Sequence, residues 1–238
     1  MKPKVKVLYA PGNNCHHELL QAFRMAGAEP TLCLLTADLL SGQQALTECD
    51  IIAIPGGFSF GDHVAAGRLF ALELNTRLAD QLKEAREKQI PMIGICNGFQ
   101  ILVNTGLLPG SAEVGQPDAL LDTNATASFE SRWVDMHIEK TNCIWTQGLE
   151  GQTLSIPVAH GEGRLMLPEN YDERLTVFRY DGDGYPANPN GSLGNRAGIT
   201  DATGRILGLM PHPERAIYNW SPSSQGLRLF ETGVNAVK

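Results

Sequence analysis

The chain carries little positive charge and has no basic cluster. Among its 238 residues, 19 are lysine or arginine and 26 are aspartate or glutamate, which gives a formal net charge of −7. Non-specific binding to nucleic acids depends on lysine and arginine side chains that neutralise phosphates. The charge balance therefore argues against a nucleic-acid-binding protein.

Long apolar runs and paired cysteines are also missing. No apolar stretch approaches the ~18 residues that a membrane-spanning helix needs. The five cysteines are scattered without a C-x-x-C pair, which argues against zinc-ribbon and thioredoxin-like sites. Their odd number and wide spacing favour reduced thiols and a cytoplasmic protein. Residues 1–12 have no small-residue cleavage site and are interpreted as a first strand, not a signal peptide.

The first half of the chain alternates between strand-like and helical patterns. Hydrophobic residues make up 42% of the sequence, enough for a sizeable core. This alternation predicts a mostly parallel sheet with helices on both faces. We expect strands over residues 5–10, 31–35, 50–54 and 91–95, and helices over 17–26 and 68–88, where apolar residues recur at three- and four-residue steps.

The second half contains shorter strand-like runs separated by turns. The runs cover 133–138, 154–159, 176–180 and 206–210, and turns are expected at 188–191 and 201–204. This pattern predicts antiparallel strands added to the same sheet. Because no linker or repeat interrupts the sequence, we expect one α/β domain over residues 1–238. Sites in open α/β sheets lie at the carboxyl ends of strands, where the glycine-rich segment 55–57 and Cys96 both fall.

The strongest local motif is G-x-C-x-G at residues 94–98, between an apolar strand and a helical pattern. It is the thiol form of the G-x-S-x-G nucleophile elbow. The residues two positions before and after the nucleophile must be small, because the arms of the turn pass close together. The helix N-terminus favours the thiolate of Cys96, and the backbone N–H of Asn97 would point toward a developing oxyanion. A lone cysteine is more often a buried core residue, but the flanking glycines favour a nucleophile.

A thiol nucleophile needs a base, and His212 in the run P-H-P-E at 211–214 is the best candidate. Prolines on both sides favour an extended chain, in which His212 and Glu214 project to the same side. The carboxylate could then orient the imidazole and complete a Cys–His–Glu triad. The alternative is a surface turn after a strand, and spacing alone does not decide between them.

Three other patterns are weaker. The adjacent His16 and His17 lack the i, i+4 spacing of a helical metal site, and the D-G-D-G run at 181–184 lacks the ligand pattern of a calcium loop, so we predict no metal. The glycine-rich loop at 55–62 lacks the ending of a phosphate-binding P-loop. It could supply a second oxyanion donor opposite Cys96, or it could be only a tight turn.

Taken together, the segments GICNGFQ (94–100), PGG (55–57) and PHPE (211–214) resemble the class I, triad-type glutamine amidotransferases. Four further segments resemble the glutaminase subunits of phosphoribosylformylglycinamidine synthases, which act in purine biosynthesis. They are IPGGFSFGD (54–62), AHGEGR (159–164), NPNGS (188–192) and GLMPHPER (208–215). The similarity extends from Val5 to about residue 216. The sequence departs from the family pattern at residues 13–17. An acidic residue commonly follows the cysteine in the family, whereas His16 follows Cys15 in this chain.

The resemblance implies a flavodoxin-like amidotransferase fold and assigns roles to individual residues. Cys96 would be the nucleophile, His212 the base and acid, and Glu214 the residue that orients His212. The backbone N–H groups of Gly57 and Asn97 would form the oxyanion hole. Gln100 would line the glutamine pocket, and the segment 160–164 would shape that pocket or dock a partner.

The resemblance also implies a reaction and partners. L-Glutamine would be hydrolysed to glutamate and ammonia, and the ammonia would pass to a large synthetase subunit, with a small bridging subunit as a further partner. ATP and Mg²⁺ are expected on the synthetase, since this chain has no recognisable ATP site, and no cofactor is expected here. Two alternatives are another cysteine-dependent α/β hydrolase, such as a γ-glutamyl hydrolase or a DJ-1/PfpI-like peptidase, and a non-catalytic docking subunit.

Overall fold

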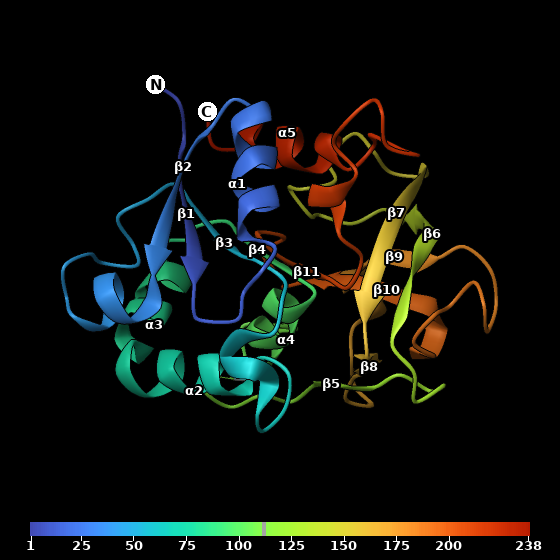
Figure 1. Cartoon of the computed structure of the whole chain (residues 1–238), viewed down its shortest axis with the longest axis horizontal. Coiled ribbons are helices and arrows are strands. Elements are labelled where there is room, and N and C mark those ends of the chain that lie inside the picture. Colours follow the sequence, from blue (N-terminus) through green and yellow to red (C-terminus); the bar gives the residue numbers. More distant parts are fainter. Residues whose placement is uncertain (111–112) are drawn as a thin grey trace.

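The computed structural model describes residues 1–110 and 113–238, and within them a nine-stranded sheet forms the centre of the molecule (Figure 1). The strand order is β2-β1-β3-β4-β11-β10-β9-β6-β7. A separate antiparallel pair joins β5 (Leu120–Thr123) to β8 (Glu162–Met166). The strands of the large sheet are β1 (Lys4–Tyr9), β2 (Glu29–Leu34), β3 (Ile51–Ile54), β4 (Met92–Ile95), β6 (Glu130–Ile138), β7 (Thr153–His160), β9 (Thr176–Tyr180), β10 (Arg196–Thr200) and β11 (Ile206–Leu209).

The parallel half of the sheet lies between two layers of helices. Strands β1, β2, β3, β4 and β11 pair in parallel, and every residue of β3 and β4 is buried, as expected for strands covered on both faces. In Figure 1, helices α1 (His16–Met25) and α5 (Leu227–Asn235) lie on one side of these strands, and α2 (Arg68–Arg77), α3 (Ala79–Glu87) and α4 (Asn97–Asn104) lie on the other. The predicted fold class is confirmed.

The prediction of one helix over residues 68–88 is wrong. The segment forms two helices, α2 and α3, which meet at Leu78 with φ −124° and ψ 19°. No proline or glycine causes the break. Leu78 is buried, and its N–H and C=O still bond to Leu74 and Leu82. One non-helical residue thus separates α3 from α2, which packs on α4.

The second half of the sheet is antiparallel, except for its innermost strand. Strand β11 pairs antiparallel with β10 but parallel with β4, so the prediction that the run 206–210 belongs to an added antiparallel strand is only half right. Strands β5, β8 and β10 were not predicted. The single domain over residues 1–238 stays a prediction.

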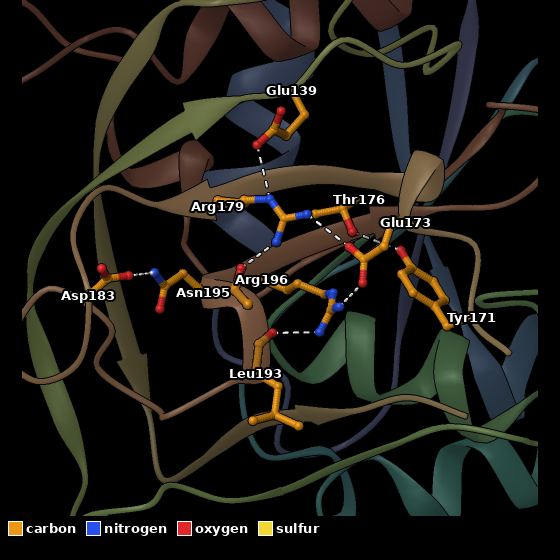
Figure 2. A network of polar contacts seen from close by, with 10 residues as sticks. Glu139, Tyr171, Glu173, Thr176, Arg179, Asp183, Leu193, Asn195 and Arg196 are labelled. Atoms are coloured by element: carbon orange, nitrogen blue, oxygen red, sulfur yellow. Dashed lines mark hydrogen bonds and ion pairs between the residues drawn. The ribbon is translucent and has the colours of Figure 1, made fainter. Parts of the chain in front are cut away.

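A network of charged side chains ties the antiparallel strands to the loops beside them (Figure 2). Glu173 accepts hydrogen bonds from Arg179 of β9, at 2.9 Å, and from Arg196 of β10. Arg179 also donates to Glu139 at 3.0 Å. Arg196 lies over the ring of Tyr171, with its guanidinium carbon 5.4 Å from the ring centroid. The network fixes the outer face of this half of the sheet.

Within the described part of the chain, none of the helices combines the length and apolar character needed to cross a bilayer.

Candidate active site

Cys96 lies on the sharp turn between β4 and α4. Its backbone has φ 52° and ψ −106°, outside the regions that residues other than glycine normally adopt. Such a conformation costs on the order of 1–3 kcal/mol and persists only where the surrounding structure enforces it. The N–H of Cys96 donates to Leu209 O at 2.8 Å, which fixes the turn to β11.

The flanking glycines are required by close backbone approaches. A Cβ atom on Gly98 would lie 2.0 Å from the carbonyl oxygen of Ile54. A Cβ atom on Gly94 would lie 2.5 Å from the carbonyl oxygen of Gly98. The spacing of the G-x-C-x-G motif therefore reflects the packing of β3, β4 and α4 around the elbow.

His212 and Glu214 form a buried pair beside Cys96. His212 Nδ1 and Glu214 Oε1 are 2.7 Å apart, and each side chain is only 1% exposed. The alternative of a surface turn is therefore wrong. The segment is not fully extended, since Pro213–Arg215 forms a 3-10 turn. The backbone N–H of His212 donates to Pro157 O of β7, which holds the histidine in place.

The charges around His212 favour its protonated form. Burial opposes the imidazolium, but the Glu214 carboxylate and then the Cys96 thiol outweigh burial and raise the pKa of His212 well above its ordinary value. The Nε2 atom has no hydrogen-bond partner of standard geometry among the described residues. Because Nδ1 is held by Glu214, Nε2 is the ring atom that can exchange a proton with a substrate.

A cavity of about 120 Å³ opens beside the thiol of Cys96. Gln100 lines it and is held in place by two contacts: its Nε2 donates to Glu162 O at 2.6 Å, and its Oε1 accepts from Asn97 Nδ2 at 3.0 Å. The other lining residues come from the segments 57–66 and 159–162 and from Phe129. The motif at 160–164 therefore contributes directly to the wall of this cavity.

The two predicted oxyanion donors are available. Gly57 lines the cavity with φ 125°, and its N–H has no partner among the described residues. The N–H of Asn97 is the first of α4 and has no carbonyl partner within its own helix. The Asn97 side chain is fully buried and accepts from the N–H of Ser59 at 3.3 Å, which links the elbow to the glycine-rich loop.

Sequence reasoning missed Cys15 and Arg215. The Cys15 thiol accepts a hydrogen bond from Arg215 Nη2 at 3.0 Å, and both residues line a second cavity, of about 210 Å³, together with His212. The position of Cys15 at the start of α1, after the carboxyl end of β1, was the signal that could have placed it near the site.

Cys15 also belongs to the one group of metal-binding residue types found among the described residues. Its thiol lies within 4.8 Å of ligand atoms of His212 and Glu214. A cation does not suit this group well, because the Arg215 guanidinium already contacts the thiol and Glu214 is hydrogen-bonded to His212 Nδ1. The contacts fit a cysteine–histidine active site better than a metal centre.

Comparisons with known proteins show the family of this chain. The sequence model for the CobB/CobQ-like glutamine amidotransferase domain matches residues 2–235. The phosphoribosylformylglycinamidine synthase subunit PurQ of Dehalococcoides mccartyi is 41% identical, over 100% of this chain and 97% of the relative. The PurQ subunit of Methanococcus maripaludis is 40% identical, over 96% of this chain and 88% of the relative. The chain belongs to the PurQ family of glutamine amidotransferases.

Solved structures extend the PurQ assignment to three dimensions. A chain in the structure of PurLQS from Thermotoga maritima superposes with a TM-score of 0.82 at 33% identity, covering 100% of both chains. The glutaminase domain of Trypanosoma brucei CTPS, with a TM-score of 0.60 at 16% identity over 98% of this chain and 94% of that chain, shares the fold. The resemblance inferred from the sequence motifs is confirmed.

Proposed function

We propose that this chain is the glutaminase subunit of a phosphoribosylformylglycinamidine synthase and that Cys96, His212 and Glu214 carry out its chemistry. The observation that carries the proposal is the buried His212–Glu214 pair beside a cysteine held in a strained elbow. A core cysteine needs neither a positive φ nor an adjacent buried histidine whose Nδ1 is held by a carboxylate. Membership in the PurQ family supplies the substrate, L-glutamine, and the destination of the ammonia.

The first half-reaction is acylation of Cys96. The thiolate attacks the side-chain carboxamide carbon of glutamine, and the oxygen becomes an oxyanion that the N–H groups of Gly57 and Asn97 stabilise. The imidazolium of His212 donates its Nε2 proton to the leaving nitrogen, so that ammonia departs and a γ-glutamyl thioester remains. Glu214 keeps Nδ1 protonated and stabilises the charged ring.

The second half-reaction restores the thiol. His212, now neutral, removes a proton from water, which attacks the thioester carbonyl. The C–S bond then breaks, glutamate leaves and Cys96 is regenerated. The sum is glutamine plus water giving glutamate plus ammonia.

The proposal requires a synthetase subunit that consumes the ammonia. The PurLQS structure of Thermotoga maritima supports an assembly with such a subunit, and a small bridging subunit belongs to the same proposal. ATP and Mg²⁺ are assigned to the synthetase. The reaction is placed in the cytoplasm, where thiols stay reduced, in keeping with the five free cysteines.

The test compares glutamine and ammonia as nitrogen donors in the complex with the synthetase subunit. Cys96→Ala is expected to abolish synthesis from glutamine but to retain synthesis from ammonium chloride. Glutamine-dependent turnover by Cys96→Ala equal to that of the wild type would show that Cys96 is not the nucleophile. If the wild-type complex releases no ammonia from glutamine, the chain is not a glutaminase, and the docking-subunit alternative takes its place.

A further inference from the structure

The peptide unit between Gly56 and Gly57 carries the oxyanion donor that comes from the glycine-rich loop. Its N–H, on Gly57, has no partner among the described residues, and Gly57 lines the cavity beside Cys96. Both glycines leave room for close neighbours. A Cβ atom on Gly56 would lie 2.8 Å from His212 Cε1, and one on Gly57 would lie 2.5 Å from the backbone nitrogen of Asn14.

Two successive glycines also make this peptide unit easy to rotate. Glycine lacks the Cβ atom that restricts backbone rotation in other residues, so a unit between two glycines can turn over at little cost. In a trans peptide unit the N–H and the C=O point in opposite directions. Rotation by half a turn would therefore present the carbonyl oxygen of Gly56 to the cavity, where it would repel a developing oxyanion instead of stabilising it.

The side chain of Asn13 contacts the carbonyl of this same peptide unit. Asn13 is 3% exposed, and its Oδ1 accepts from the N–H of Ala10 at 3.0 Å. Because a backbone N–H can only donate, this contact identifies the oxygen of the amide. The Nδ2 atom then points to the glycine-rich loop, where it donates to Pro55 O at 3.4 Å and to Gly56 O at 3.3 Å.

A second contact fixes the peptide unit that follows. The N–H of Phe58 donates to Gly12 O at 3.0 Å. The carbonyl before Gly57 and the N–H after it are thus both held by residues 12–13, which lie beyond the end of β1. The N–H of Gly57 lies between these two held groups and stays available to a substrate. A hydrogen bond to the carbonyl of a peptide unit also polarises that unit and makes its N–H a better donor.

We propose that Asn13 is a positioning residue for glutamine hydrolysis, which holds the carbonyl of Gly56 so that the N–H of Gly57 faces the oxyanion formed at Cys96. The inference rests on the proposed function, which places the carboxamide of glutamine at Cys96. Asn13 lines neither cavity and acts only through the peptide unit that it holds. Because this donor is oriented before the oxyanion forms, no reorganisation is needed during the reaction.

The test uses Asn13→Asp and Asn13→Ala in the complex with the synthetase subunit. Asn13→Asp keeps the oxygen that accepts from Ala10 and replaces only the NH2 group, so that a carboxylate oxygen faces the carbonyls of Pro55 and Gly56. Asn13→Ala removes the amide without adding a charge. This second variant decides the question if the buried carboxylate prevents folding.

The matched control is the same pair of substitutions at Asn188, which is 5% exposed and makes the same set of contacts. Its Nδ2 donates to Ser192 O at 2.9 Å and to Asn195 Oδ1 at 3.0 Å. Its Oδ1 accepts from the N–H of Gly191 at 2.9 Å. These hydrogen bonds are shorter than those of Asn13, and Asn188 lines neither cavity. The Asn188 variants should therefore lose at least as much stability in thermal unfolding but keep the wild-type kcat.

The assays measure kcat and KM for glutamine and the rate at which iodoacetamide alkylates Cys96. In the Asn13 variants kcat should fall roughly 10- to 100-fold, because loss of an oxyanion donor costs about 100- to 1,000-fold and a misplaced donor keeps part of its effect. KM should stay within about twofold of the wild type, since the donor acts on the transition state more than on bound substrate. Alkylation should proceed at the wild-type rate, because displacement of iodide by the thiolate forms no oxyanion.

Three results would overturn the proposal. The first is a wild-type kcat in the Asn13 variants. The second is alkylation of Cys96 that slows as much as kcat, which would mean that Asn13 only maintains the structure of the site. The third is an equal loss of kcat in the Asn188 variants, which would tie the loss to stability. Failure of the proposed function is a separate result, because it would appear as glutamine hydrolysis that persists in Cys96→Ala whatever residue stands at position 13.

Discussion

Adding one methyl group at Gly56 is expected to slow glutamine hydrolysis while leaving the fold intact. Gly56 has an ordinary φ, so alanine causes no backbone strain there. The new Cβ would lie 2.8 Å from His212 Cε1, 3.2 Å from Cys15 Sγ and 3.4 Å from Cys96 Cβ. The methyl group would therefore occupy the space between the nucleophile and its base.

The size of the effect follows from these distances. Ordinary van der Waals contact begins at 3.4 Å, so the His212 ring must retreat by about 0.6 Å from its position at 2.8 Å. Misplacement of a catalytic group by ~1 Å can cost about 100-fold in rate, and we expect a loss of about 10- to 100-fold in kcat. Repacking around one extra methyl group should destabilise the fold by about 1–3 kcal/mol.

The assay measures glutamine-dependent and ammonium-dependent synthesis in the complex, together with thermal unfolding of the chain. Gly148→Ala is the matched control. Gly148 has φ 79° and nothing within 4 Å of an added Cβ, so this variant should lose about 1 kcal/mol of stability through backbone strain. It should nevertheless keep the wild-type kcat, because position 148 lies outside both cavities.

Gly56→Ala should retain synthesis from ammonium chloride, which bypasses the glutaminase site. The reasoning is refuted if Gly56→Ala hydrolyses glutamine at the wild-type rate. It is also refuted if the two glycine variants lose activity in proportion to stability alone.

Three further predictions concern the triad, the elbow and the outer face of the sheet. Glu214→Gln should lower kcat by roughly 1,000-fold in single-turnover assays, because the neutral amide cannot stabilise the imidazolium of His212; a loss below tenfold would contradict the role of Glu214 as orienter. Gly98→Ala should destabilise the chain by about 3 kcal/mol or more in denaturant unfolding, because its Cβ would overlap the carbonyl of Ile54; an unchanged midpoint would contradict the packing of the elbow. Burial raises the pKa of Glu173, but hydrogen bonds from two arginines outweigh burial and hold that pKa below its usual value. Glu173 therefore stabilises the fold above its unfolded pKa and loses that contribution as pH falls through its folded pKa. Glu173→Gln should therefore lower the free energy of unfolding by about 1 kcal/mol near neutral pH, because solvent screens the carboxylate, and should leave it unchanged in acid. An equal loss of stability at both pH values would argue against the ion-pair network.

Strands and the elbow could be predicted from sequence because their causes are local. Residues 94–98 carry the small residues that the turn needs, and apolar runs marked β3 and β4. The break at Leu78 could not be predicted, since neither proline nor glycine precedes it and the two helices keep their apolar spacing across it. Only the structure shows the break, next to a helix, α2, that packs against α4.

In the candidate site, too, contacts between residues close in the chain could be predicted from the sequence, whereas contacts between distant residues could not. The His212–Glu214 contact could be predicted because the two residues are two positions apart. The place of Cys15 beside His212 could not, since nearly 200 residues separate them and only the packing of α1 against the turn Pro213–Arg215 brings them together. Asp62 and Glu162 likewise line the same cavity although they are far apart in the chain.

Strand β7 ends the nine-stranded sheet, and its free edge faces the catalytic residues. Its carbonyl groups at Pro157 and Ala159 accept from the N–H of His212 and the thiol of Cys96. An unpaired edge strand is a template for aggregation, and Pro157 removes one of its donors. The catalytic elbow and the His212 segment therefore also protect this edge from pairing with other chains. We expect a chain truncated before residue 211 to lose solubility as well as activity.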